Sequence, residues 1–185
     1  FWSMGLLYQN SWQGYWIGFN RAFPWDDESV FSRLSARYYR KEFEVKKEVK
    51  SAKAYIVGLG LYELYLNGEK IGDQVLAPTP TDYTKNVKYN VFDVTSNIHS
   101  GENVVGTILG NGKFYSCRKY KFYKIKDFGY PKMLFQLEIE YTDGTKDLVV
   151  SDESWKGTAD GPIRANNEYD GETFDARKQL GEHQR

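Results

Sequence analysis

Apolar and polar positions alternate most regularly over residues 61–66. Tyr62, Leu64 and Leu66 share one face of an extended chain, and the residues between them share the other. This period of two is the signature of a β-strand. Asn67-Gly68 follows at once, a dipeptide that accepts the positive φ angles of a two-residue hairpin turn. The pattern therefore predicts a β-hairpin in which Glu69–Gly72 is the return strand.

The same alternation predicts strands along most of the chain. Lys132–Tyr141 carries an apolar side chain at every second position, and Asn103–Leu109 is a short, β-branched apolar run typical of a buried strand. No amphipathic helix longer than about two turns is predicted. The pattern indicates an all-β fold, an antiparallel β-sandwich of the jelly-roll type. The remaining predicted strands are Ala36–Val45, Ser51–Val57, Lys88–Val94, Lys146–Val150 and a last strand that starts at Trp155.

Glycines and prolines mark the places where this regular pattern is interrupted. Gly58 and Gly60 predict a bulge or a close approach of two backbone segments. Pro78 and Pro80 break the sheet after the hairpin, because proline donates no backbone hydrogen bond. The loop at residues 77–88 is therefore the segment in which we first look for function.

The chain is predicted to divide into three parts. Residues 36–160 form the β-sandwich, and residues 1–35 are an irregular, aromatic segment that follows a preceding domain. Within that segment, Asp26–Glu28 is interpreted as a solvated acidic loop and Ser29–Leu34 as one short helical turn. Residues 161–185 are polar and are predicted to leave the sandwich toward downstream domains. The start, Phe1 rather than Met, is typical of a cut within a longer protein.

Composition narrows the class of function. The basic and aromatic segment Lys113–Lys126 has the composition of a surface that binds single-stranded nucleic acid. The formal net charge of +0 argues against a nucleic-acid partner. Aromatic residues make up 17% of the chain, a share that suits either sheet packing or a carbohydrate-contacting surface. No run of about 18 apolar residues is present, so no membrane span is predicted.

Few residues offer catalytic or metal chemistry. Cys117 is the one cysteine, and neither His99 nor His183 has a partner motif, so the sequence favours neither a nucleophilic triad nor a zinc site. Paired carboxylates for glycoside hydrolysis can be found, for example Glu172 with Asp175 or with Asp170. They lie in a polar tail, a poor place for a raised pKa, and are interpreted as structural or interdomain residues. Oxygen ligands on loops suffice for calcium. Asp82 and Asn86 are the calcium candidates, with Asn111 of the Gly110-Asn111-Gly112 turn as a further oxygen donor.

Several segments together resemble the N-terminal β-sandwich region of bacterial α-L-rhamnosidases, which is non-catalytic. The resemblance covers nearly the whole chain in the right order. The matching segments are Trp12–Gly18, Leu34–Phe43, Gly58–Asp73, Leu76–Thr95, Gly101–Gly112 and Tyr169–Arg177.

The resemblance implies a galactose-binding-like sandwich and a parent enzyme that releases terminal L-rhamnose. The catalytic domain of that family is a helical barrel that follows this region, so no catalytic residue is expected in the chain. Neighbouring domains of the same chain are the expected partners, and the parent is expected to be exported to the periplasm or the medium. A free-standing carbohydrate-binding module and a purely structural interdomain module remain the alternatives.

The resemblance also implies a candidate binding surface. In some family members the equivalent sandwich binds rhamnose in a calcium-dependent manner, so a rhamnose-containing glycan is a candidate partner and calcium a candidate cofactor. The loop of this chain departs from the tryptophan-containing form, with Thr84 and Lys85 where acidic or amide residues would help to hold calcium. The carbohydrate candidates are Asp82, Tyr83, Asn86, Asn111 and Tyr115.

Overall fold

The predicted strands form, and their register is antiparallel throughout. The computed structural model describes residues 5–6, 8–26, 33–115 and 128–181. Three short 3-10 turns accompany the strands, namely η1 (Gln9–Ser11), η2 (Thr95–Asn97) and η3 (Ala176–Lys178). The strands are β1 (Arg37–Val45), β2 (Val49–Leu59), β3 (Leu61–Leu66), β4 (Glu69–Lys70), β5 (Asn90–Asp93), β6 (Gly101–Gly110), β7 (Lys132–Tyr141), β8 (Lys146–Val150), β9 (Lys156–Thr158), β10 (Ile163–Asn167) and β11 (Gly171–Phe174).

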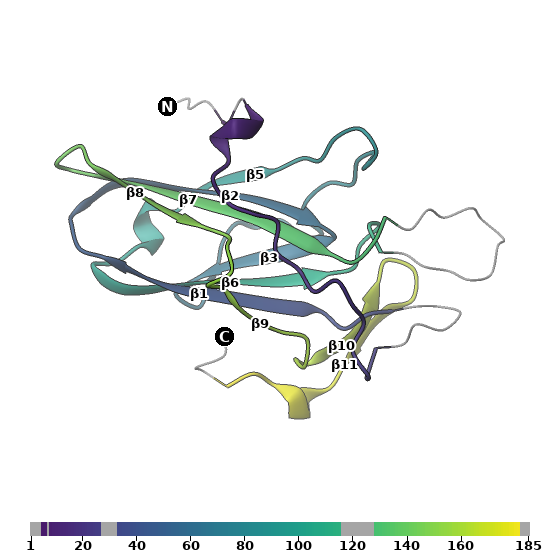
Figure 1. The fold of residues 1–185 in the computed structure, drawn as a ribbon. Helices are drawn as coiled ribbons and strands as arrows, with labels where there is room; N and C mark the ends of the chain where they lie inside the picture. Colours follow the sequence, from purple (N-terminus) through teal and green to yellow (C-terminus); the bar gives the residue numbers. More distant parts are fainter. Residues whose placement is uncertain (1–4, 7, 27–32, 116–127, 182–185) are drawn as a thin grey trace.

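Two antiparallel sheets face each other as the layers of a sandwich (Figure 1). One has the strand order β4-β3-β6-β1-β9, and the other has the order β5-β2-β7-β8. The β10–β11 hairpin forms a separate two-stranded sheet. The prediction of an all-β, antiparallel sandwich is therefore confirmed. Among the described residues, no helix has the length and apolar character that crossing a membrane requires.

The hairpin between β3 and β4 turns at the predicted dipeptide. Asn67 and Gly68 have φ angles of 52° and 85°, as a turn of this kind requires. The Asn67 amide nitrogen donates to the Asn97 carbonyl, 2.8 Å away, and its oxygen accepts from the Val104 backbone N–H at 2.9 Å. The turn residue therefore also ties the hairpin to β6.

The core lies between the two sheets and follows the alternation in the sequence. On β7 the inward residues Met133, Phe135, Leu137 and Ile139 are all 1% exposed or less. The opposite layer contributes equally buried side chains to the same cluster, including Leu64, Leu66, Val105 and Leu109.

The segment at residues 11–26, here called the strap, crosses from one sheet to the other. At its start, the Gln13 N–H donates to the side chain of Gln136 on β7 at 2.8 Å, and Ile17 forms a β-bridge with Met133. Farther on, the Phe19 ring stacks on Tyr39 of β1, with 5.6 Å between centroids. Figure 1 shows this purple segment running from the four-stranded layer to the five-stranded one.

The interpretation of the acidic patch as a solvated loop was wrong for Asp26. Its carboxylate accepts from Arg37 of β1 at 3.0 Å, and both side chains are 0% exposed. The same carboxylate accepts from the Ser35 backbone N–H at 2.6 Å and from the Phe23 N–H at 2.8 Å. Buried charges persist when they are paired and hydrogen-bonded in this way. Asp27, Glu28 and most of the predicted helical turn lie outside the described residues.

The polar C-terminal part of the chain also packs onto the sandwich. The prediction that the last strand begins near Trp155 was wrong, because β10 and β11 follow β9. The Ala36 N–H donates to the Ile163 carbonyl at 3.0 Å, and the Asn166 N–H donates to the Leu34 carbonyl at 3.2 Å. The β10–β11 hairpin is thus hydrogen-bonded to the chain that enters β1.

Candidate functional site

The candidate loop at residues 77–88 contains a tight turn held by Asp82. One carboxylate oxygen of Asp82 accepts from the backbone N–H of Thr84 at 3.1 Å and from its hydroxyl at 2.5 Å. The Asp82 carbonyl accepts from the N–H groups of Lys85 and Asn86, at 2.9 and 3.1 Å. These local bonds leave the side chains of Asp82 and Asn86 exposed at the surface.

Tyr83 attaches this turn to the body of the protein. Its ring meets Phe114 and Phe128 edge-on, with 5.2 Å between centroids in both pairs. Burial raises the pKa of the Tyr83 hydroxyl, and the nearby carboxylate of Glu168 raises that pKa further. The ring is half-buried, so part of it stays accessible beside Asp82.

The structure places Asn111 and Tyr115 in the interior, although both belong to the segment against which Tyr83 packs. Asn111 is 0% exposed, and its amide nitrogen donates to the Leu34 carbonyl at 2.9 Å. Its side-chain oxygen is buried and accepts no hydrogen bond from any described residue. Tyr115 is 5% exposed and stacks on Tyr130. Of the five carbohydrate candidates, solvent therefore reaches Asp82, Tyr83 and Asn86.

The calcium candidates make only a partial ligand set. Calcium takes six to eight oxygen ligands, and the exposed turn offers one carboxylate and one side-chain amide, four residues apart. The Lys85 ammonium lies 3.5 Å from the Asp82 carboxylate and would compete with a calcium ion for that carboxylate. No three His, Cys, Asp or Glu side chains converge anywhere in the described part of the chain. Calcium binding here stays a prediction.

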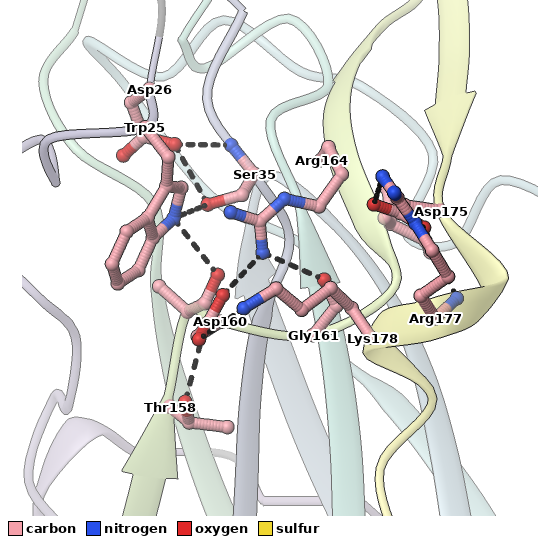
Figure 2. Close-up of polar contacts among 12 residues, drawn as sticks. Trp25, Asp26, Ser35, Thr158, Asp160, Gly161, Arg164, Asp175, Arg177 and Lys178 are labelled. Atoms are coloured by element: carbon pink, nitrogen blue, oxygen red, sulfur yellow. Dashed lines mark hydrogen bonds and ion pairs between the residues drawn. The ribbon is translucent and has the colours of Figure 1, made fainter.

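A second polar site lies at the β9 edge of the five-stranded sheet, where β9 leads into β10. Asp160 accepts from Arg164 at 2.6 Å and from Lys178 at 3.0 Å, and Arg164 also donates to the Gly161 carbonyl (Figure 2). Close by, Asp175 and Arg177 form a two-pronged ion pair with both contacts at 2.8 Å. We call these five charged residues, from Asp160 to Lys178, the C-terminal ion-pair cluster.

Trp25 joins the strap to this cluster. Its indole N–H is 3.2 Å from both the Ser35 hydroxyl and the Ala159 carbonyl. Figure 2 shows the contact with Ser35. The guanidinium of Arg164 lies over the indole ring, 5.2 Å from its centroid. The strap, the chain entering β1 and the β9–β10 connection therefore meet at one point.

The carboxylates of the cluster are not arranged for acid–base chemistry. Hydrogen bonds from Lys178 and Arg164 lower the pKa of Asp160, and the bond from Arg177 lowers the pKa of Asp175 to about 2. A general acid at neutral pH needs a raised pKa instead. The cluster is therefore suited to holding the hairpin in place.

An open-sided cavity of about 340 Å³ adjoins the cluster. Its walls come from β1 and β9, with Asp160 and Leu180 completing the rim. Tyr39 belongs to the wall, and burial raises the pKa of its hydroxyl to about 12. The volume is at the small end of the range for ligand pockets.

Sequence reasoning missed the partners in both sites. Phe114 and Phe128 are 14 positions apart in the chain, and no periodicity in the sequence connects either ring to Tyr83. Asp160 and Arg164 are four residues apart in a segment that is not helical, so their spacing carried no signal for an ion pair. Asp26 and Arg37 are brought together only by the strap.

Comparison with known proteins gives a consistent result. The family model of the alpha-L-rhamnosidase N-terminal domain matches residues 47–185. An alpha-L-rhamnosidase of Formosa agariphila is 44% identical over 153 residues, which is 80% of this chain and 16% of that protein.

Two solved structures show that the similarity extends to the three-dimensional fold. The alpha-L-rhamnosidase from Dictyoglumus thermophilum is 40% identical with a TM-score of 0.82, over 96% of this chain and 20% of that one. The Streptomyces avermitilis enzyme, solved in complex with L-rhamnose, is 36% identical with a TM-score of 0.73, over 80% of this chain and 14% of that one. The chain thus spans about a fifth or less of these relatives. It belongs to the alpha-L-rhamnosidase N-terminal domain family.

Proposed function

We propose that this domain is a non-catalytic accessory module of an α-L-rhamnosidase, a parent polypeptide that releases terminal L-rhamnose through a domain outside this chain. The observation that carries the proposal is the family match over residues 47–185, combined with relatives of which this chain spans only 14–20%. Its role in the parent is to pack against neighbouring domains and to present the loop at residues 77–88.

The electrostatics of the described residues support a non-catalytic role. Each aspartate or glutamate there whose pKa is shifted has that pKa lowered, as Asp152 and Asp160 show. Inverting and retaining glycosidases both need one carboxylic acid with a raised pKa opposite a second carboxylate. The described carboxylates with shifted pKa values instead form ion pairs or accept hydrogen bonds within turns.

The test compares the 185-residue chain with the full-length parent polypeptide on an aryl α-L-rhamnoside. We expect turnover by the parent and none above buffer by the 185-residue chain. Turnover by the shorter chain at a rate near that of the parent would contradict the non-catalytic role. A parent that hydrolyses other glycosides but not rhamnosides would contradict the assignment of substrate.

As a second function we propose that the exposed turn binds a rhamnose-containing glycan. Asp82 and Asn86 would hydrogen-bond the sugar hydroxyls, and the accessible part of Tyr83 would contact an apolar face of the ring. This is supported by the position of Tyr83, whose packing on Phe114 and Phe128 fixes the ring beside the two polar side chains. It is also supported by the crystallised complex of the Streptomyces avermitilis relative with L-rhamnose.

Calorimetric titration with L-rhamnose, in calcium and in EDTA, tests the second function. We expect Asp82→Asn to weaken binding about tenfold, because a charge-assisted hydrogen bond to the sugar is lost. Asp143→Asn is the matched control, since Asp143 makes the same turn bonds to Thr145 on the far hairpin. A flat trace for the unmodified chain in both buffers would contradict sugar binding, and packing against neighbouring domains would then be the one remaining role. A loss of heat in EDTA would support the calcium proposal.

A further inference from the structure

Two large aliphatic side chains are exposed at the tip of the loop between β4 and Ala77. Val75 is 81% exposed and Leu76 is 66% exposed. The residues at the two ends of this loop, Ile71 and Ala77, are buried at 8% and 7% exposure. Single exposed aliphatic residues are normal, but two adjacent ones on a protruding loop form a local apolar surface that water solvates poorly. We call Val75 and Leu76 the apolar tip.

The backbone at the tip is strained as well as exposed. Leu76 has a φ of 59°, in the left-handed region where the Cβ of an L-residue crowds the following carbonyl oxygen. Asn or Gly would adopt this conformation more easily. Leu76 is mostly exposed, so burial within the described structure offsets little of this strain. Strained residues of this kind cluster at functional sites such as ligand clamps and switch regions.

The loop is nevertheless held firmly at its base. The Ile71 N–H donates to the Leu64 carbonyl at 2.8 Å, and the Tyr62 N–H donates to the Ala77 carbonyl at 2.7 Å. Gly72, with a φ of 78°, lies so close to the Phe92 ring that a Cβ would be 2.6 Å from a ring carbon. The loop is therefore pinned at both ends, and its tip is already positioned before any partner arrives.

The tip also lies beside an open sheet edge. The side-chain oxygen of Gln74 accepts from the amide of Asn90 on β5, 3.3 Å away. β5 is the outermost strand of its sheet, and Val91 on that strand is 42% exposed. Figure 1 shows the blue-to-teal segment before β5 reaching beyond the strands of this sheet. The loop that carries the apolar tip is thus hydrogen-bonded to the β5 edge through Gln74.

We propose that the apolar tip docks into an apolar recess on a neighbouring domain of the parent polypeptide. The choice of occupant follows from length, because the matched relatives devote about four-fifths or more of their chains to segments that this chain does not cover. Interfaces draw most of their binding energy from a few buried anchors at the centre. The inference rests on the proposed accessory role and adds the surface through which that role is exerted.

The first experiment measures burial of the tip directly. Val75→Cys is introduced together with Cys117→Ser, both in the full-length parent and in the 185-residue chain, and labelling by an uncharged maleimide is followed by peptide mass spectrometry. We expect labelling to be at least tenfold slower in the parent. The matched control is Leu148→Cys on β8, the opposite edge of the same sheet, where Leu148 is 44% exposed. Equal labelling rates for the Val75→Cys variant in the two chains, or equal slowing at the β8 control, would overturn the proposal.

A second variant separates docking from folding. Leu76→Asn relieves the left-handed strain and removes the apolar anchor. We expect it to raise the urea midpoint of the 185-residue chain while speeding labelling of Val75→Cys in the parent by tenfold or more. A lowered midpoint, or unchanged labelling in the parent, would count against the proposal.

The same labelled chains distinguish two further outcomes. Labelling that slows with protein concentration in the 185-residue chain would assign the tip to a second copy of this domain and overturn the proposal. Rhamnoside hydrolysis by the full-length parent tests the accessory role separately. Hydrolysis with an accessible tip would therefore overturn the docking surface and leave the proposed function intact.

Discussion

At the scale of single residues, the buried pair of Arg37 and Asp26 has the greatest consequence. Both side chains are 0% exposed, and the carboxylate accepts two further backbone N–H bonds, from Ser35 and Phe23. A buried ion pair is a poor source of net stability compared with an apolar pair of the same size, but breaking it leaves one charge stranded in a medium of low polarity.

Asp26→Ala is therefore expected to lower the free energy of unfolding by about 3 to 5 kcal/mol. Urea denaturation monitored by circular dichroism measures this loss. The matched control is Glu44→Ala, whose partner Lys46 is 74% exposed, and a surface pair of this kind is worth about 0 to 1 kcal/mol. A loss below about 1 kcal/mol for Asp26→Ala would mean that Arg37 finds water or another partner.

One residue-scale prediction from the sequence concerned Gly58 and Gly60. The close backbone approach is confirmed at Gly60, where an added Cβ would lie 2.2 Å from the Gly110 carbonyl oxygen. The φ of 133° at this residue is a second reason for glycine. This close contact lets β2 pass directly into β3, so that consecutive strands lie in opposite layers.

At the scale of elements, the β10–β11 hairpin is positioned by hydrogen bonds and ion pairs more than by apolar burial. All four residues of β11 are exposed, so this strand buries little apolar surface. The hairpin is held by backbone bonds to the chain entering β1 and by the contacts of Asp160 with Arg164 and Lys178. The pKa of Asp160 is lowered in the folded state by these two partners.

Acidification is expected to loosen this anchor. A carboxyl whose folded pKa is lowered contributes stability that is fully present above its unfolded value of about 3.9. That contribution is lost as the pH falls through the lower folded pKa. The reporter is the NMR resonance of the Trp25 indole N–H, because Arg164 lies over that ring.

We expect the resonance to titrate with a midpoint below about pH 3.9 and to lose that titration in Asp160→Asn. Asp143→Asn serves as the control, since Asp143 belongs to the distant β7–β8 turn. A titration that persists unchanged in Asp160→Asn would show that another carboxyl governs the contact.

At the scale of the whole molecule, the strap makes one folding unit of both sheets. The side chain of Gln136 and the hydroxyl of Ser151 are 0% exposed, and both bond to strap residues. On the other layer the strap supplies the partner of Arg37. Residues that the sequence placed outside the sandwich therefore satisfy polar groups inside it.

A chain that begins at residue 27 is expected to lose more stability than Asp26→Ala alone, because it also removes the strap groups that bond to Gln136 and Ser151. Thermal and urea unfolding measure the loss. The control begins at Tyr8, which removes the hydrogen bond from Tyr89 to the Leu6 carbonyl and should lower stability by about 0.5 to 1.5 kcal/mol. Equal stability of the two truncated chains would make the strap dispensable.

The sequence by itself determined the strands up to β9, the hairpin turn and the family. Alternation over Leu61–Leu66 and Lys132–Tyr141 was enough, because a strand with one buried face repeats every two residues whatever lies opposite it. The Asn67-Gly68 turn could also be predicted from the sequence, because positive φ angles are favoured by those two residue types themselves. The loop containing Asp82 and Tyr83 could be singled out by its prolines.

Tertiary structure alone decided which polar residues lie inside. Asp26 looked like a solvated acid, Asn111 like a ligand-binding residue of a turn, and the segment after Gly161 like a departing tail, yet each is bonded to residues far away in the chain. The physical reason is that burial and charge pairing belong to pairs of residues, whereas strand periodicity and turn conformation belong to single segments. Only the folded chain brings those pairs together.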